Sequence, residues 1–513
     1  MDKKYHVVVV GGGIAGLSTA IAYAKNANVG ANPILVLEKA PKVGGMVTSF
    51  KRDGYLFDTV QMIPEVTHLF EYFGVDLPLR RFEGHCARLF LADPASGTAE
   101  RVDIPSGISP FKEMLMARFP DSGTSAAQLV DYSAALYDEL KHLRMESSWL
   151  GNLSMLLNCR RIIASTNLTF QRYMNKFGVI DPALREIFEI FTAFAGMPAE
   201  RVPALLVASV MTSTLRGCYR PTRGFIKLPH VLRKRAEALG AEIRCKSRVE
   251  KIVVEDGAVK GVVLEGGDVI AANYVVTAMD TKVALLALVG EAQLRRAEPT
   301  YAERLNSIKM SPSSMTISLG LDDHLDLAGL GMDCGYNVIT TGKGTFEKMF
   351  QAFDRGEIGY SDRCFHTAAI SPSLTTGGKQ TIIIRVVPMP VADWVDLRNR
   401  DPQRYAERKK ETADFFISQV ERYLIPSLTR HIKVIDIASP ATFERYVGTP
   451  TGSIYDMAPY PDNFGRTRLK LKTPIKGLLL PKFTHGIYGG LQAGIHTADH
   501  ILGGAVCKGR FAV

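Results

Sequence analysis

Hydrophobic and polar positions divide the start of the chain into three short elements. Residues 5–10 form an apolar, β-branched run of strand length, which is typical of a strand buried on both faces. Residues 18–24 are helix-like, and residues 34–37 form a second apolar run that ends at Glu38. The pattern therefore predicts a strand, a helix and a second strand.

Strand-like and helical runs return along the rest of the chain. The further predicted strands cover residues 249–254, 259–264, 274–278, 314–319, 381–387 and 473–480. The stretch 111–215 is helical in pattern, and residues 402–423 predict a long helix with one solvated, cationic face. Two dipeptides, Asp256-Gly257 and Gly266-Gly267, mark hairpin turns in the middle of the chain.

A glycine-rich turn joins the first predicted strand to the first helix. It has Gly11, Gly13 and Gly16 in the G-x-G-x-x-G spacing that dinucleotide sites require between a strand and a helix. Gly11 permits the tight turn, Gly13 lets the backbone approach a pyrophosphate, and Gly16 lets the helix pack closely on the strand. The helix N-terminus supplies amide donors, and Glu38 is placed to accept hydrogen bonds from ribose hydroxyls. This segment predicts a bound dinucleotide.

Composition and charge exclude several protein classes. The chain has 513 residues, with 46% hydrophobic and 22% charged side chains, so collagen-like, disordered and disulfide-framework proteins are excluded. A membrane-spanning helix needs about 20 apolar residues, and the run 202–215 stops at Arg216. The net charge of +10 favours anionic partners such as membrane headgroups or acidic ligands. No basic run with interleaved aromatic residues supports nucleic acid as a partner.

Cysteine and histidine spacing predicts neither disulfides nor a metal site. The seven cysteines are scattered without a C-x-x-C pair, which favours free thiols in a reducing cytosol. The histidines show no ligand spacing, so we expect no metal. His496 and His500, four positions apart on a predicted helix, are expected at the surface. We expect a cytoplasmic protein.

Several segments resemble those of a known group of flavoproteins. Residues 38–49, with Gly44-Gly45, resemble the second glycine-rich segment of the amine-oxidase and carotenoid-desaturase superfamily. Residues 221–229 and 489–494 resemble two distant segments of that superfamily, and residues 54–58 resemble its G-[YF]-x-F-D stretch. Over essentially its whole length, the chain resembles the phytoene desaturase, carotenoid isomerase and retinol saturase group of FAD-dependent oxidoreductases.

The chain departs from the group's pattern at positions that face the flavin or the substrate. Met46 stands where a basic residue is usual, and Val60-Gln61 replaces a glycine-proline pair. In the mid-chain loop, Leu374 or Thr375 stands where an aspartate is expected. The resemblance therefore does not imply that the substrate is a carotene.

The resemblance implies an α/β fold with FAD as cofactor. Residues 1–80, 215–290 and 465–513 would build one doubly wound, Rossmann-type FAD-binding domain. Residues 81–214 would form a helical cap facing substrate or membrane, and residues 291–464 a mixed α+β substrate domain. The residues expected to bind FAD are Gly11, Gly13, Ile14, Ala15, Gly16, Glu38, Lys39, Gly45, Met46, Val249, Ala278, Gly490 and Leu491.

The implied chemistry is hydride transfer between carbon and flavin N5, which desaturates, saturates or isomerises C=C bonds in a lipophilic carotenoid- or retinoid-type substrate. His485 and Tyr488 precede the predicted flavin-facing helix and are candidates to relay a proton, or else they shape the turn. Tyr455-Asp456 could likewise face the cavity. Arg223 could hold an acidic substrate head or pair with a phosphate.

Two other functions stay open, as do the partners. The first is an amine-oxidase-type enzyme for a small amine or acid, with which Tyr488 and Lys482 are compatible. The second is a non-catalytic FAD- or lipid-binding protein. No second G-x-G-x-x-G is present, so electrons would exchange with a quinone, oxygen or another external partner. The apolar, cationic stretch 149–176 either lies in a membrane interface or roofs the substrate cavity.

Overall fold

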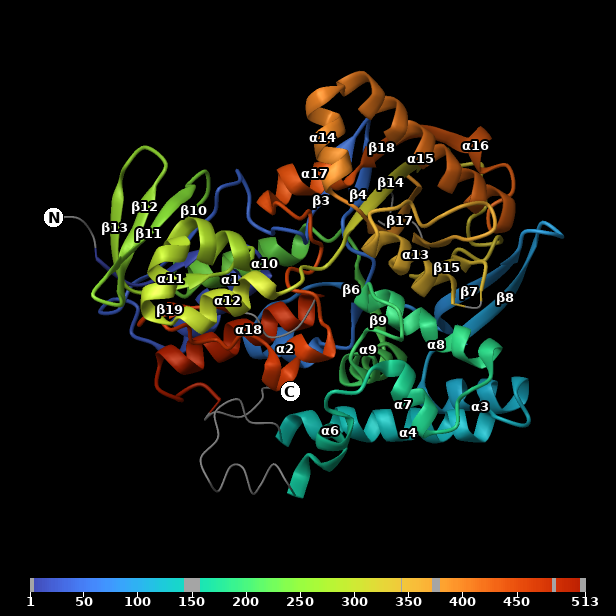
Figure 1. The fold of residues 1–513 in the computed structure, drawn as a ribbon, viewed down its shortest axis with the longest axis horizontal. Helices are drawn as coiled ribbons and strands as arrows, with labels where there is room; N and C mark the ends of the chain where they lie inside the picture. The colour runs from blue at the N-terminus through green and yellow to red at the C-terminus, as the bar shows by residue number, and fades with distance from the viewer. Residues whose placement is uncertain (1–3, 143–156, 343, 371–378, 482–485, 508–513) are drawn as a thin grey trace.

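The computed structural model describes residues 4–142, 157–342, 344–370, 379–481 and 486–507. Two seven-stranded sheets organise the chain, and a group of helices covers one end (Figure 1). In the part of the chain that is described, no helix is both long and apolar enough to cross a bilayer.

The first sheet is mainly parallel and has the strand order β10-β2-β1-β13-β12-β11, with β19 paired to β13. Its strands are β1 (Tyr5–Val10), β2 (Ile34–Leu37), β10 (Glu242–Arg244), β11 (Val249–Glu255), β12 (Ala258–Leu264), β13 (Val269–Thr277) and β19 (Leu478–Leu479). Strand β1 lies between β2 and β13, both parallel to it. Because helices cover it, its valines are buried on both faces, which explains the continuous apolar run.

Three helices from distant parts of the chain gather beside this sheet. Helix α1 (Ile14–Asn26) packs against both α10 (Lys227–Ala238) and α18 (Gly486–Ile501). Figure 1 shows the three lying side by side, although they come from the start, the middle and the end of the chain. The predicted α/β class, with one Rossmann-type unit assembled from separate segments, is confirmed.

The second sheet is mixed, with the order β18-β14-β17-β16-β15-β7-β8. Its strands are β7 (His85–Asp93), β8 (Thr98–Pro105), β14 (Ser313–Leu321), β15 (Asn337–Thr340), β16 (His366–Ile370), β17 (Thr381–Met389) and β18 (Ile432–Ala438). Alternate residues of β17 face opposite sides. Ile382, Ile384 and Val386 join the core that includes α15 (Pro402–Tyr423), whereas Ile383 faces the core of the cap.

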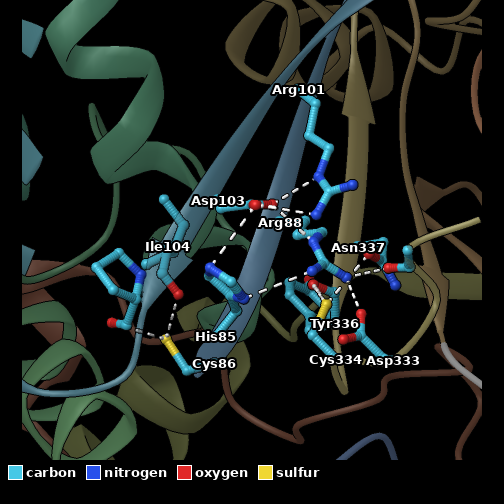
Figure 2. Close-up of polar contacts among 12 residues, drawn as sticks. His85, Cys86, Arg88, Arg101, Asp103, Ile104, Asp333, Cys334, Tyr336 and Asn337 are labelled. Atoms are coloured by element: carbon cyan, nitrogen blue, oxygen red, sulfur yellow. Dashed lines mark hydrogen bonds and ion pairs between the residues drawn. The ribbon is translucent and has the colours of Figure 1, made fainter. Parts of the chain in front are cut away.

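Residues 85–105 differ from the expectation that they belong to the helical cap. They form the β7–β8 hairpin, and β7 pairs in parallel with β15, far along the chain. Figure 2 shows why the hairpin is held there. The buried Arg88 donates from Nε to Asp103 on β8 at 2.6 Å, and its Nη1 contacts Asp333 in the loop before β15. A partner this distant in sequence leaves no local pattern.

The cap consists of helices that pack on one another and on the second sheet, and it lies at the lower right of Figure 1. They are α3 (Ile108–Arg118), α4 (Gly123–Glu139), α6 (Arg160–Ser165), α7 (Phe170–Lys176), α8 (Pro182–Ala195) and α9 (Ala204–Arg216). Strand β9 (Cys218–Pro221) leads from α9 back to the first sheet and pairs with β5 (Ile63–Pro64) and β6 (Leu79–Arg81). The cap is therefore anchored next to the cofactor domain.

Shorter elements complete the two domains. Strands β3 (Ser49–Arg52) and β4 (Tyr55–Asp58) form a hairpin, and β4 contacts β17 of the second sheet. Further helices are α2 (Thr67–Phe73), α11 (Glu291–Ala297), α12 (Pro299–Ser307), α13 (Thr345–Asp354), α14 (Ala392–Arg400), α16 (Leu428–His431) and α17 (Pro440–Phe443). The strands predicted over 314–319 and 381–387 correspond to β14 and β17, and the helix predicted over 402–423 is α15.

Candidate functional site

The glycines between β1 and α1 form a turn that only glycine can build. Gly11 has a φ of +109°, and a Cβ at this position would lie 2.4 Å from the carbonyl oxygen of Ala278. A Cβ on Gly16 would lie 2.0 Å from the carbonyl oxygen of Gly11. Gly13 differs, because no atom lies within 4 Å of its Cβ position. Its backbone therefore faces open space at the N-terminus of α1, the arrangement that a pyrophosphate needs.

Glu38 lies at the end of β2, beside this turn. Its side chain is buried, and Oε2 accepts a hydrogen bond from the Gly12 amide at 2.8 Å. Oε1 accepts one from the Ala40 amide, also at 2.8 Å. Each carboxylate oxygen has a second lone pair, so Glu38 can still accept from a ribose hydroxyl. The backbone contacts hold the carboxylate in the orientation that this role requires.

The second glycine-rich segment lies against the first. The Gly44 amide donates to the carbonyl of Gly12 at 2.9 Å, and a Cβ on Gly45 would lie 3.5 Å from Gly13 Cα. Met46, which stands where a basic residue is usual, lines the same space. The two loops therefore form one cradle, in which Met46 brings no charge to the position where a basic residue is usual, while Lys39 and Lys42 of the same segment line the cavity.

Chain segments from the middle and the end complete the cradle. Val249 at the start of β11 and Ala278 after β13 both line the cavity. Gly490 lies where α18 crosses α1, and its carbonyl accepts a hydrogen bond from Ser18 Oγ at 2.8 Å. Leu491 is fully buried in the apolar core and does not line the cavity. Its expected contact with the cofactor is therefore not made by its side chain.

Lys39 follows Glu38 and also borders the cavity. Its Nζ donates to the carbonyl oxygen of Val447 at 3.0 Å. Burial lowers the pKa of Lys39, and the nearby Arg248 lowers it further. Lys39 thus joins the helical turn η3 (Glu444–Gly448) to the end of β2, where the adenosine half of a dinucleotide would lie if Glu38 held its ribose.

The cradle opens into a cavity of about 2100 Å³ that continues between the cap and the second sheet. Single small-molecule sites are typically about 300–1,000 Å³, so this space has room for a dinucleotide and a second molecule. The expected cofactor residues Ile14 and Ala15 lie at one end, and Phe194 and Leu206 of the cap lie at the other. The open space at Gly13 and the accepting carboxylate of Glu38 fit FAD.

The cap half of this cavity carries no charge in the part that is described. Between residues 137 and 214, the described residues that line it include no Asp, Glu, Lys, Arg or His. Most are apolar. They are Tyr137, Leu140, Cys159, Ile162, Ile163, Ser165, Thr166, Asn167, Phe194, Ala195, Pro203, Leu205, Leu206, Ser209, Val210, Ser213 and Thr214.

The carboxylates among the described lining residues all come from other segments and already have donors. Besides Glu38, they are Asp280, Asp456 and Asp499. Asp280 accepts from the Val283 amide at 2.8 Å, and Asp456 accepts from the Thr281 amide at 2.8 Å. Each therefore holds a turn in place. Within the described residues, no three or more His, Cys, Asp or Glu side chains gather where they could bind a metal ion.

The two candidate proton-relay residues are His485 and Tyr488. His485 lies outside the described residues. Tyr488, in the first turn of α18, lines the cavity and packs against the cap residues Leu136 and Tyr137. Burial raises the pKa of Tyr488 far above its ordinary value. Its hydroxyl is therefore protonated at neutral pH and can donate a hydrogen bond, but it cannot act as a base there.

Tyr455 and Asp456 both line the cavity, as the sequence suggested they could. Tyr455 donates from its hydroxyl to the carbonyl oxygen of Phe194 at 3.0 Å, which joins the loop before η4 (Pro461–Asn463) to the cap. Burial raises the pKa of Tyr455, although the nearby Arg385 opposes this effect. Arg223 is exposed and does not line the cavity, so it holds neither a substrate head nor a phosphate there.

One histidine lies where the sequence did not predict it, and two arginines of the cavity were not predicted at all. His496 was expected at the surface but is buried on the face of α18 that borders the cavity, and burial lowers its pKa to about 4. Arg385 and Arg468 line the cavity and carry buried guanidinium groups. An arginine inside a run of β-branched residues was the available signal for Arg385. Arg468 lies in an irregular segment that gave no such signal.

A family model and several known proteins match this chain in sequence. A model of the FAD-dependent oxidoreductase family matches residues 6–346. The chain is 25% identical over 338 residues to the 4,4'-diapolycopene oxygenase of Methylomonas sp, covering 63% of this chain but only 64% of that protein, less than two thirds of its length. It is 22% identical over 468 residues to the chloroplastic prolycopene isomerase of Daucus carota, covering 88% and 72%.

Solved structures share the fold at low sequence identity. An oxidoreductase from Methanosarcina mazei has a TM-score of 0.65 at 14% identity, covering 96% of this chain and all of that one. A putrescine oxidase bound to putrescine has a TM-score of 0.62 at 15% identity, covering 98% and 99%. The family model covers well over half of the chain, and the cradle fits the cofactor named by that family. The chain belongs to the FAD-dependent oxidoreductase family.

Proposed function

We propose that this protein uses FAD to add, remove or rearrange C=C bonds in an apolar polyene of the isoprenoid type. The observation that carries the proposal is the cap half of the cavity, whose described lining residues are uncharged. A polyene offers no group that needs a charged partner, and burial of its carbons from water drives its binding. Relatives named as a 4,4'-diapolycopene oxygenase and prolycopene isomerases support the same substrate class.

When bound, FAD supplies a carrier for hydride at flavin N5, and the protein's contribution is to bind, orient and exclude water. The cradle around Gly13 and Glu38 fixes the dinucleotide. The apolar side chains of α9 and α6 hold a lipophilic chain and keep water from the reacting carbons. We assign Tyr488 the role of a neutral hydrogen-bond donor at the junction between these halves, because its raised pKa keeps its proton in place.

An amine substrate fits this cavity less well. A protonated amine binds best to a carboxylate or an aromatic cage, and the described cap residues offer no carboxylate to the cavity. The carboxylates Asp280 and Asp456 already bind backbone amides and belong to the loops around the cofactor. The fold shared with putrescine oxidase therefore does not by itself favour an amine substrate for this chain.

We further propose a membrane surface as the source of substrate and a quinone or other external molecule as the electron partner. Ile163 on α6 lines the cavity and is 42% exposed, and Leu157 just before α6 is 57% exposed. Arg160 begins the same helix. An apolar rim beside a cation suits a bilayer interface, and the net charge of +10 suits anionic lipids.

The test is anaerobic turnover by the FAD-loaded full chain. The flavin is reduced chemically, and its absorbance is followed after addition of a polyene or a quinone. Oxidised enzyme is mixed in parallel with carotenoid and retinoid substrates, and products are separated by chromatography. Conversion of a polyene supports the proposal. Hydrogen peroxide released with a panel of amines would instead assign the amine-oxidase function, and a flavin that exchanges electrons with no substrate would assign a carrier.

A further inference from the structure

Arg385 is the one charged side chain in the described part of β17, and it lines the cavity. Its neighbours Ile384 and Val386 pack into the core with α15, so Arg385 faces the opposite side, toward the cap. It lines the cavity together with Thr59 and Tyr455. Arg385 therefore enters the cavity from the second sheet, next to Thr59, whose hydroxyl donates to the carbonyl oxygen of Met46 in the cradle.

The guanidinium of Arg385 has few partners for a charge removed from solvent. Nη2 donates to the carbonyl oxygen of Thr59 at 2.8 Å, and among the described residues Nε has no hydrogen-bond partner. Burial lowers its pKa, and the groups that act against this effect are the hydroxyls of Tyr455 and Tyr336. No carboxylate of the described residues forms an ion pair with it.

Two buried arginines away from the cavity have carboxylate partners, unlike Arg385 and unlike Arg468, whose Nε and Nη1 also lack partners among the described residues. Arg88 is 2% exposed and has an ion pair with Asp103 at 2.6 Å and another with Asp333. Arg220 is 4% exposed and has an ion pair with Asp58 at 2.9 Å. Both hold strands or loops together. Arg385 has no such carboxylate among the described residues, so a purely structural role does not explain why a cation is placed there.

A second side chain with a polar atom that lacks a partner among the described residues lies beside Arg385, and we call the two the Arg385 patch. Thr316 on β14 is its partner in the strand register, and the Thr316 hydroxyl is buried without a hydrogen-bond partner among the described residues. Side chains at paired positions lie on the same face of the sheet. Buried donors that lack acceptors cost free energy unless a ligand supplies the acceptor. The donors of the Arg385 patch can be satisfied by an oxygen atom of a ligand or of ordered water.

We propose that Arg385 binds an oxygen-bearing end of the substrate, most tightly a carboxylate, so that the preferred substrate is a polyene with one oxidised terminus. This inference rests on the proposed function and narrows its substrate class. The uncharged cap holds the hydrocarbon chain, and Arg385 fixes how far that chain enters. Its position relative to the flavin would then select which C=C bond reacts.

Binding measurements on the FAD-loaded full chain test this without relying on turnover. The probes are all-trans-retinoic acid, all-trans-retinol and the methyl-ended hydrocarbon with the same chain. Dissociation constants are measured by equilibrium dialysis. Because a hydrogen bond to a charged group is worth more than one between neutral groups, we expect the acid to bind about 10- to 100-fold more tightly than the hydrocarbon.

Variants at Arg385 test whether this side chain causes the tighter binding of the acid relative to the hydrocarbon. In Arg385→Gln, the acid and the hydrocarbon should bind within about threefold of each other, while hydrocarbon binding stays as in the parent protein. Arg385→Lys should restore part of the preference, because the charge returns without the planar fork. Arg355→Gln is the matched control. It removes the same charge from an exposed site paired with Glu357, and it should keep the full preference.

The outcomes separate this inference from the proposed function. If the parent protein binds all three probes equally, or if Arg385→Gln keeps the preference, the inference is wrong while the polyene function stands. If Arg385→Gln loses FAD, measured by flavin absorbance per chain, Arg385 serves the cofactor and the inference is again wrong. If none of the polyenes binds, the proposed function itself fails.

Discussion

The cofactor cradle and the cap half of the cavity are built by different means. The cradle is made of backbone: Gly11 and Gly16 allow atoms to approach where any side chain would collide, and Gly13 leaves space for a ligand. The cap half is made of side chains from α4, α6, α8 and α9, and its specificity lies in the charges that its described residues lack.

Because the two halves are built differently, cofactor binding and substrate binding depend on different kinds of residues. A glycine turn fixes geometry and tolerates almost no substitution, so the cradle determines which cofactor binds. An apolar wall tolerates exchange of one hydrocarbon side chain for another of similar volume, so it can change substrate without loss of the fold. Arg385 and Tyr455 lie where the two halves meet. Substitutions on each side should therefore affect FAD and polyene separately.

The largest effect is expected from Gly11→Ala. The added Cβ would lie 2.4 Å from the Ala278 carbonyl oxygen, and alanine rarely adopts a φ of +109°. We expect FAD affinity to fall by at least about 100-fold, equivalent to about 3 kcal/mol. Flavin absorbance per chain after dialysis measures it.

Gly257→Ala is the matched control for this prediction. Gly257 has a φ of +70° in the β11–β12 turn, but no atom lies near its Cβ position. Backbone strain alone should cost about 1 kcal/mol of stability and leave FAD content unchanged. If both variants lost FAD equally, strain in the fold and not closure of the cradle would be the cause.

The same difference explains what the sequence could predict. The turn from Gly11 to Gly16 and the acid at Glu38 lie within one short segment, so their spacing is visible locally and the cofactor site followed from it. The α15 helix and strands β14 and β17 were predictable because their apolar positions repeat along each element.

The substrate side could not be predicted in this way. Its lining residues come from α4, α6, α8, α9 and the β17 strand, and which face of each element meets the cavity depends on packing between distant segments. His496 illustrates this. A histidine four positions from His500 on a helix suggests an exposed pair, but α18 is buried along this face, so His496 lies inside. The β7–β8 hairpin likewise joined the second sheet through β15, a strand far away in the chain.

The next largest effect is expected from a charge placed in the cap. Leu206 on α9 is buried and lines the cavity. In Leu206→Glu, a polyene must desolvate a carboxylate or displace the water around it, and we expect its affinity to fall about 30-fold, or about 2 kcal/mol. Retinol dissociation constants from equilibrium dialysis measure this.

Leu206→Met serves as the conservative control and should change retinol affinity by less than about threefold, because methionine has a similar volume. FAD content should be normal in both variants. Improved binding of a cationic amine by Leu206→Glu would show that charge in the cap selects the substrate. Loss of FAD in Leu206→Glu would contradict the separation of the two halves.

A smaller effect is expected in the cradle from Glu38→Gln. The amide keeps one acceptor oxygen, but its NH2 group would face either the Gly12 or the Ala40 amide, both of which now donate to Glu38. We expect FAD affinity to fall about 10-fold, while the dissociation constant for retinol in the FAD-saturated protein stays the same. Glu255→Gln, an exposed change at the end of β11, should leave both constants unchanged. Equal losses in the two constants would mean that the halves are coupled.

The smallest effect is expected in how the free energy of unfolding depends on pH. It arises from His366, a buried histidine that lies away from the cradle. His366 on β16 is buried, its ring stacks on Phe346 with centroids 4.3 Å apart, and burial lowers its pKa to about 4 from an ordinary value near 6.5. Between these two values the unfolded chain binds a proton that the folded chain does not, so the free energy of unfolding must fall as the pH falls. From pH 7.5 to 5.5, His366 alone should lower the free energy of unfolding by about 1 kcal/mol.

His366→Phe keeps the stacked ring and removes the titrating group. In denaturant unfolding at the two pH values, the variant should therefore lose about 1 kcal/mol less stability than the parent protein. The flavin spectrum should be identical in both, because His366 lies beneath the cap and not in the cradle. An unchanged acid sensitivity would show that His366 takes up a proton as readily in the folded protein as in the unfolded chain, and that its pKa is not lowered by burial.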